Sequence, residues 1–115
     1  MKLNLLVIRT EKPEILKSQY ELLGFEFDHH RHGNGPFHYA TEFNDFVFEI
    51  YPLTKSMTKA DNSIRLGFEI ENLEMKIKEL ENSNWIIKSP LSVTEWGIVA
   101  VVKGLDGRKI EMKNK

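Results

Sequence analysis

Apolar and polar side chains alternate along the segment F-V-F-E-I-Y-P-L, which begins at Phe46, and this period of two predicts a β-strand. Phe46, Phe48 and Ile50 share one face, which we expect to belong to the core. Glu49 and Tyr51 share the opposite face. Because a glutamate is rarely buried without a partner, this second face must be solvated, paired or part of a functional site.

The first half of the chain shows the pattern of a strand, a helix and three further strands. The helix has Thr10 as its expected N-cap, Pro13 in its first turn and Gly24 just beyond its end. An apolar stripe at positions i, i+4 and i+7 gives the helix one buried face. The four strands are expected at residues 3–8, 25–30, 37–43 and 46–53.

A tight turn at residues 44–45 sets the pairing of the two strands that it joins. With two residues in the turn, His38 lies opposite Tyr51 and shares the face of Glu49. An error of one residue in the turn would put Tyr39 on that face in place of His38.

The same order of elements recurs after a polar segment without periodicity, residues 54–62, which is the expected linker. Asn72 is the expected N-cap of the second helix. Strands are expected at residues 64–71, 85–87, 98–102 and 109–113, with a break at residues 90–92 and a turn at residues 105–108. The pattern therefore predicts an internal repeat with a period of about 61 residues.

The fold class that follows is α+β, with two tandem βαβββ modules at residues 1–53 and 63–115 of one domain, residues 1–115. A single module of this size has a marginal core, so we expect the two modules to curl into a cup-shaped mixed sheet with the helices outside. Its concave side would be a small-molecule pocket. The side chains expected to point into the cup are Asn4, Leu6, Ile8, Val47, Glu49, Tyr51, Arg65, Gly67, Glu69, Lys109, Glu111 and Lys113.

Composition excludes several classes of function. The 16 basic and 17 acidic residues give a net charge of −1, which offers no footprint for nucleic acid. No apolar run approaches the length of a membrane span. Cysteine is absent, so a disulfide frame and a thiol nucleophile are excluded. We expect a cytoplasmic protein and, because its sheet edges would be unpaired, a homodimer.

Five short motifs together resemble the vicinal oxygen chelate superfamily, which contains glyoxalase I, bleomycin-resistance proteins and extradiol dioxygenases. The motifs are YELLGF at residues 20–25, FEIYP at 48–52, LGFEIENL at 66–73, WG at 96–97 and DGRKIE at 106–111. They occur in order over nearly the whole chain. The resemblance implies the paired-module fold and a site for a small organic ligand.

Superposing the two halves places Asn4 on Arg65 and Glu49 on Glu111. The resemblance implies that these four positions hold the metal ligands of metal-dependent members, with histidines at the first pair and glutamates at the second. Both glutamates are present and both histidines are replaced. We therefore expect no metal or other cofactor, although a divalent metal, if bound, would use Glu49 and Glu111. Arg65, which is always charged, would instead lie between the two carboxylates.

Four histidines lie close together in the sequence, namely His29, His30, His32 and His38. Consecutive strand residues point to opposite faces, so His29 and His30 cannot chelate one ion jointly. Their spacing is not a standard zinc pattern. Two interpretations remain: a solvated polar loop, or a loop in which His32 overhangs the pocket and His38 lies inside it. Trp96 would either line the pocket or pack against neighbouring residues.

Three functions agree with these observations. The first is a metal-free protein that binds a small, apolar or aromatic molecule. The second is a metal-dependent lyase, isomerase or dioxygenase in which Glu49 is a metal ligand or a general base. The third is a small interaction module. We favour the first, with a ligand site built from Glu49, Arg65, Glu111, His38, Tyr51, Trp96 and Asn4.

Overall fold

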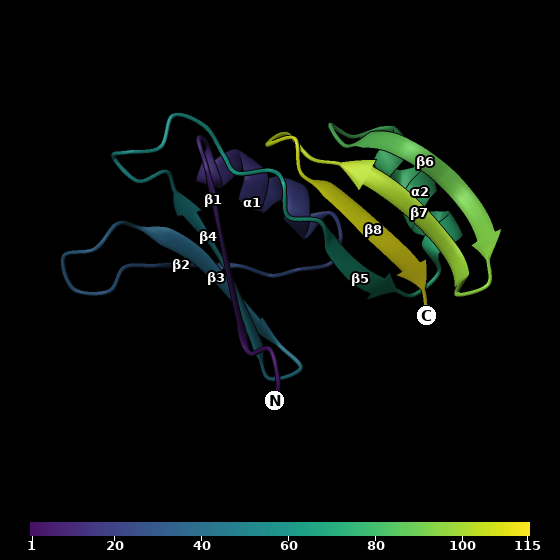
Figure 1. Cartoon of the computed structure of the whole chain (residues 1–115), viewed down its shortest axis with the longest axis horizontal. Helices are drawn as coiled ribbons and strands as arrows, with labels where there is room; N and C mark the ends of the chain where they lie inside the picture. The colour runs from purple at the N-terminus through teal and green to yellow at the C-terminus, as the bar shows by residue number, and fades with distance from the viewer. The chain divides into compact units, whose positions relative to one another are not determined.

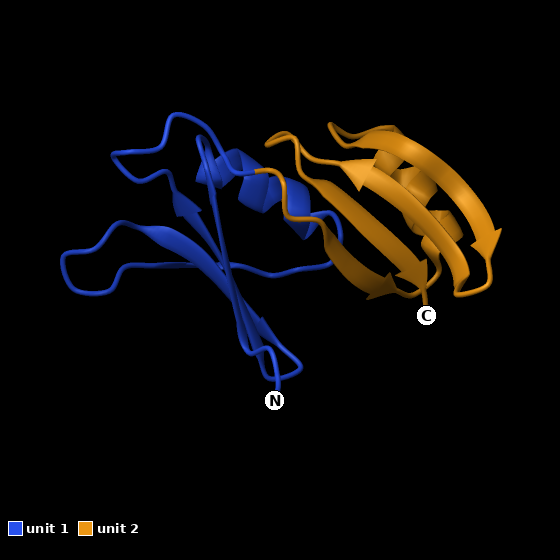
Figure 2. Ribbon diagram, viewed as in Figure 1, with its two compact units in different colours: residues 1–61 blue, residues 62–115 orange.

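The βαβββ order predicted from the sequence occurs twice in the computed structural model, which describes residues 1–115. Two compact units, residues 1–61 and residues 62–115, each contain one copy (Figure 2). The α+β class and the internal repeat are therefore confirmed. The expected cup and the expected single domain stay predictions, and each unit is described by itself.

The first unit is a four-stranded sheet with one helix (Figure 1). Its elements are β1 (Leu5–Thr10), α1 (Pro13–Glu21), β2 (Asp28–His30), β3 (His38–Phe43) and β4 (Phe46–Pro52). The strand order is β1-β4-β3-β2, with β1 parallel to β4 and the other neighbours antiparallel. Helix α1 packs on β1, β3 and β4. We call the opposite side of the sheet, which carries Val7, Arg9, His38, Glu49 and Tyr51, the helix-free face.

Phe48 lies at the centre of the first core and is fully buried. Its ring centroid lies 5.3 Å from that of Tyr20 on α1 and 5.6 Å from that of Phe25. Ile50, two residues along the same strand, is also fully buried. The alternation along β4 therefore separates a core face from the face of Glu49 and Tyr51, as predicted.

Helix α1 begins later than the sequence predicts. Thr10 is the last residue of β1, where it pairs with Pro52 and is 3% exposed. The N-cap is Lys12, which makes no side-chain cap, and Pro13 occupies the first helical turn. The prediction of Thr10 as N-cap is wrong because pairing with β4 extends the strand to this residue.

A two-residue turn joins β3 to β4, as predicted. Asn44 and Asp45 both have positive φ, 50° and 61°, which is the backbone of a type I′ hairpin. Ala40 consequently pairs with Glu49. Tyr39 pairs with Ile50 on the core side, so of the two alternatives left open by the sequence, His38 is the residue that shares the face of Glu49.

The second unit repeats the arrangement. Its elements are β5 (Leu66–Ile70), α2 (Leu73–Glu81), β6 (Ile86–Thr94), β7 (Gly97–Lys103) and β8 (Lys109–Asn114). The strand order is β5-β8-β7-β6, with β5 parallel to β8. The predicted break at residues 90–92 is wrong, because β6 continues through it. The strand accommodates Pro90 by shifts in register on either side of Ser89, which is how a sheet tolerates a proline.

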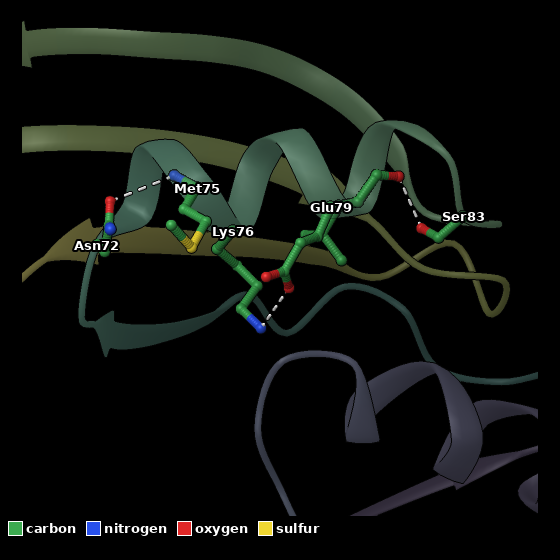
Figure 3. Close-up of polar contacts among 6 residues, drawn as sticks. Asn72, Met75, Lys76, Glu79 and Ser83 are labelled. Carbon is green, nitrogen blue, oxygen red and sulfur yellow. Dashed lines mark hydrogen bonds and ion pairs between the residues drawn. The ribbon is translucent and has the colours of Figure 1, made fainter.

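Polar side chains define both ends of α2 (Figure 3). Asn72 has a positive φ of 51°, and its side-chain oxygen accepts a hydrogen bond from the backbone N–H of Met75 at 3.4 Å. At the other end the Ser83 hydroxyl donates to the carbonyl of Leu80 at 2.7 Å. The predicted Asn72 cap is therefore confirmed.

The turn between β7 and β8 contains a buried ion pair. Arg108 Nη1 lies 2.7 Å from Asp106 Oδ2, and the two side chains are 2% and 0% exposed. Asp106 Oδ1 also accepts the backbone N–H of Arg108 at 3.0 Å. Gly107 supplies the positive φ of 84° that the turn needs.

No helix in the chain is long and apolar enough to cross a membrane.

Candidate functional site

The strand register of the first unit gathers polar side chains on the helix-free face. Val7 of β1 lies beside Glu49 of β4, and Arg9 lies beside Tyr51. From the other side, β3 brings His38 to the same end of the face as Tyr51. A cation, a carboxylate, a phenol and an imidazole therefore meet on this face.

The two faces of the first strand are interchanged relative to the prediction, which placed Leu6 and Ile8 on the side opposite the core. Leu6 and Ile8 pair with Phe48 and Ile50, and Ile8 is 3% exposed, so these two side chains belong to the core face. Residues at the alternate positions, Leu5, Val7 and Arg9, occupy the helix-free face in their place.

The corrected phase changes the match between the modules. Val7 pairs with Glu49, and Gly67 pairs in the same way with Glu111. Val7 and Gly67 are therefore equivalent positions of the two modules. Two residues before them lie Leu5 and Arg65, which are equivalent in the same way. Asn4, which was predicted to match Arg65, instead precedes β1 and accepts the backbone N–H of Val47 through its carbonyl at 2.9 Å.

His38 is the most buried polar group on the helix-free face, at 1% exposure. Its Nδ1 lies 3.3 Å from the carbonyl oxygen of Pro36. Its Nε2 lies 3.1 Å from Oε2 of Glu49, whose side chain is 14% exposed. Although this contact is short, Nε2 makes no hydrogen bond.

Tyr51 covers one face of the His38 ring. The two rings are stacked, with centroids 4.1 Å apart and planes at 7°. The guanidinium carbon of Arg9 lies 4.9 Å from the centre of the Tyr51 ring, and Arg9 Nη1 donates to the carbonyl of Pro52 at 3.0 Å. Burial raises the pKa of Tyr51, the Glu49 carboxylate raises it further, and the Arg9 cation opposes both effects. Tyr51 is thus held as a neutral phenol.

The histidines of β2 point to opposite faces, as predicted. His29 stacks on Phe37 and on Tyr39, with centroids 4.9 Å apart in each pair. The ring of His30 instead lies 6.0 Å from that of His38. His32, in the loop after β2, lies with its ring centroid 5.0 Å from that of His38.

His32, His38 and Glu49 form a cluster that the sequence analysis did not assemble. Each offers one ligand atom, and these atoms all lie within 4.8 Å of one another. Two partial signals are present in the sequence: the histidines on either side of residues 33–36, which match no standard zinc spacing, and the two-residue turn that puts His38 on the face of Glu49. The third member comes from a different strand, so its position depends on the pairing of β3 with β4.

In the second unit, Arg65 lies beside Glu111, with Nη1 and Oε1 3.9 Å apart. Both side chains are about half exposed, at 52% and 50%. The predicted association of these two residues is therefore present as a long, solvated pair. The predicted place of Glu49 beside them stays a prediction. Trp96 is 70% exposed in the turn between β6 and β7, and its role, in binding or in packing, stays a prediction.

Comparison with known proteins identifies the fold and no family. No family model matches the chain, and no curated protein matches it. Solved structures do match over nearly the full length. TnmS3, described as an antibiotic binding protein from Streptomyces sp. CB03234, is 17% identical with a TM-score of 0.77, and the match covers 99% of this chain and 95% of that one.

Two further matches have different descriptions. An integron cassette protein from the mobile metagenome of V. cholerae is 22% identical with a TM-score of 0.71, covering 99% of this chain and 94% of that one. A protein described as oxidase ChaP-H2 is 11% identical with a TM-score of 0.73, covering 100% and 94%. At these identities the matches establish a shared fold, which serves a binding protein and an enzyme alike.

Proposed function

We propose that this chain is a small-molecule-binding protein of the glyoxalase/bleomycin-resistance type, and that it binds its ligand without that superfamily's metal centre. The ligand is a planar organic molecule, recognised on the helix-free face of the first unit's sheet. The observation that carries the proposal is the stack of Arg9, Tyr51 and His38 beside the Glu49 carboxylate. Aromatic and polar groups that converge in this way are typical of ligand sites.

The residues at the superfamily's metal positions support the absence of that metal centre. The positions that would carry histidines hold Leu5 and Arg65 by the strand register. Leucine has no donor atom, and an arginine cannot lose its proton to become a ligand. Glu49 and Glu111 then remain as carboxylates that bind hydrogen-bond donors of an organic ligand, with Arg65 as a counter-ion of Glu111.

The similarity to TnmS3, described as an antibiotic binding protein, supports the ligand class. A planar aromatic drug-like molecule would bury its ring against Tyr51 and present a donor group to Glu49. We propose Trp96 as a further contact because a large exposed aromatic side chain in a turn is free to cover a ligand.

We also propose that the protein acts as a homodimer. Light scattering coupled to gel filtration tests this by measuring the mass of the particle in solution.

Thermal shift in the presence of a chelator tests the proposal. We expect several planar aromatic compounds from a screen to raise Tm in a concentration-dependent way. Tyr51→Ala and Glu49→Gln should abolish the shift, whereas Glu95→Gln, which removes an exposed glutamate in the β6–β7 turn, should leave it unchanged. Absence of any aromatic ligand, or equal shifts in all variants, would contradict the proposal.

One contact favours an enzyme as the second candidate. The 3.1 Å approach of His38 Nε2 to Glu49 Oε2 resembles the pairing of a general base with the group that orients it. In this version the protein is a lyase, isomerase or dioxygenase of the same superfamily, and Glu49 abstracts a proton from the bound ligand. Turnover of a compound found in the screen, lost in Glu49→Gln with binding retained, would favour this candidate.

A further inference from the structure

We propose that His32, His38 and Glu49 form a binding site for a divalent transition metal within the first unit. This site goes beyond the proposed function and differs from the superfamily's metal centre, which the resemblance places on the first and last strands of both modules. Here two of the three ligands come from β3 and from the loop before it. Only Glu49 is common to the two arrangements.

The protonation of His38 is the first step of the argument. The carbonyl oxygen of Pro36 can only accept a hydrogen bond, so Nδ1, at 3.3 Å, is the atom that carries the hydrogen. In the neutral ring Nε2 then carries a lone pair. A backbone carbonyl that fixes the tautomer in this way is the usual second partner of a metal-bound histidine.

The surroundings of Nε2 are the second step. The atom is buried, forms no hydrogen bond and faces a carboxylate oxygen at 3.1 Å. Two acceptors at this distance repel each other unless a proton or a metal ion lies between them. Zinc lies about 2.0–2.2 Å from histidine nitrogen and carboxylate oxygen, so one ion can contact both atoms at their present separation, with a ligand–metal–ligand angle close to a right angle.

His32 completes the set. Its ring is tilted by 31° against that of His38 at 5.0 Å, and the ligand atoms of the three residues all lie within 4.8 Å. In tetrahedral coordination two ligands of one ion lie about 3.4 Å apart, so His32 needs to move by at most about 1.5 Å. Its side chain is exposed on a turn that contains Gly33 and Gly35, which permits such a movement.

The donor set indicates which metals fit. Two imidazoles and one carboxylate suit Zn²⁺, Fe²⁺, Co²⁺ and Ni²⁺, whereas Mg²⁺ and Ca²⁺ prefer oxygen ligands. Three protein ligands leave at least one coordination position open. Tyr51, stacked on the His38 ring, holds the imidazole plane, and the contact of Nδ1 with the Pro36 carbonyl orients the ring within that plane.

Metal titration of the full chain tests the site. Protein stripped with chelator and then freed of it is titrated with Co²⁺ and followed by its visible absorption, and with Zn²⁺ and followed by calorimetry. We expect one equivalent per chain. Glu49→Gln and His32→Gln should weaken binding by roughly 100-fold, since the loss of even an outer partner costs about 10–100-fold. His29→Gln is the matched control, because His29 lies on the opposite face, and it should bind as the unchanged protein does.

Two outcomes would overturn the proposal: no binding of Co²⁺ or Zn²⁺ by the folded chain, or binding that His29→Gln weakens as much as His32→Gln. His32 is exposed and Glu49→Gln keeps the shape of the side chain, so the test does not depend on a variant of the buried His38. Because the ligand screen is performed in chelator, failure of the metal site and failure of the proposed function give separate results.

Discussion

The imidazole of His38 and the phenol of Tyr51 lie face to face, with centroids 4.1 Å apart and planes only 7° from parallel. The stack joins the first residue of β3 to the end of β4, on the face that carries Glu49. It excludes water from one side of the imidazole, which is 1% exposed. The stack thereby holds the imidazole plane beside the glutamate, whose Oε2 lies 3.1 Å from Nε2.

Replacing Tyr51 by leucine should remove the stacking energy, whereas phenylalanine should keep it. We expect Tyr51→Leu to lower the free energy of unfolding by about 0.5–1.5 kcal/mol beyond its loss of buried area. Tyr51→Phe should change it by less than about 0.5 kcal/mol. Urea denaturation in chelator measures both values. Equal losses in the two variants would mean that the ring pair contributes nothing.

The turn between β3 and β4 predicts a stabilising substitution. Asp45 has a φ of 61°, and glycine adopts this conformation without the steric cost that a Cβ imposes. Asp45→Gly should therefore raise the free energy of unfolding by up to about 1 kcal/mol. The ion pair that it removes, Lys2–Asp45 at 3.5 Å, is exposed and contributes little.

Asn44→Val gives the opposite test at the neighbouring position, where φ is 50°. A β-branched residue is strained there, and we expect the free energy of unfolding to fall by about 1–2 kcal/mol. Thermal denaturation of both variants measures the two effects. An unchanged Tm in Asn44→Val would show that the turn does not hold this backbone.

The buried pair in the β7–β8 turn predicts a large loss. Asp106→Ala leaves the Arg108 guanidinium buried without the carboxylate that lies 2.7 Å from it, and this should lower the free energy of unfolding by about 3–5 kcal/mol. Lys78→Met is the control, because its pair with Glu74, at 3.8 Å, leaves both side chains 71% exposed on α2. The control should cost less than about 1 kcal/mol. Similar losses in both variants would contradict the structural role of Asp106.

Strand faces could be predicted where the sequence alternates and not where it is uniformly apolar. Around Phe48 the alternation identifies the core face without help from the fold. The run L-N-L-L-V-I at residues 3–8 fits either phase, because apolar residues occupy both faces. Only pairing with β4 decides that Ile8 is buried and that Arg9 lies beside Tyr51. The same pairing extends β1 to Thr10 and moves the helix start to Pro13.

The sequence by itself determined the repeat, the βαβββ order of each module and the side of β4 on which Glu49 lies, because these follow from local periodicity and turn chemistry. It also placed His38 on that side once the two-residue turn was assumed. The tertiary structure decided the rest. Which atoms of His32, His38 and Glu49 approach one another depends on hydrogen-bonded register and on the course of a glycine-containing loop, and no local pattern encodes either.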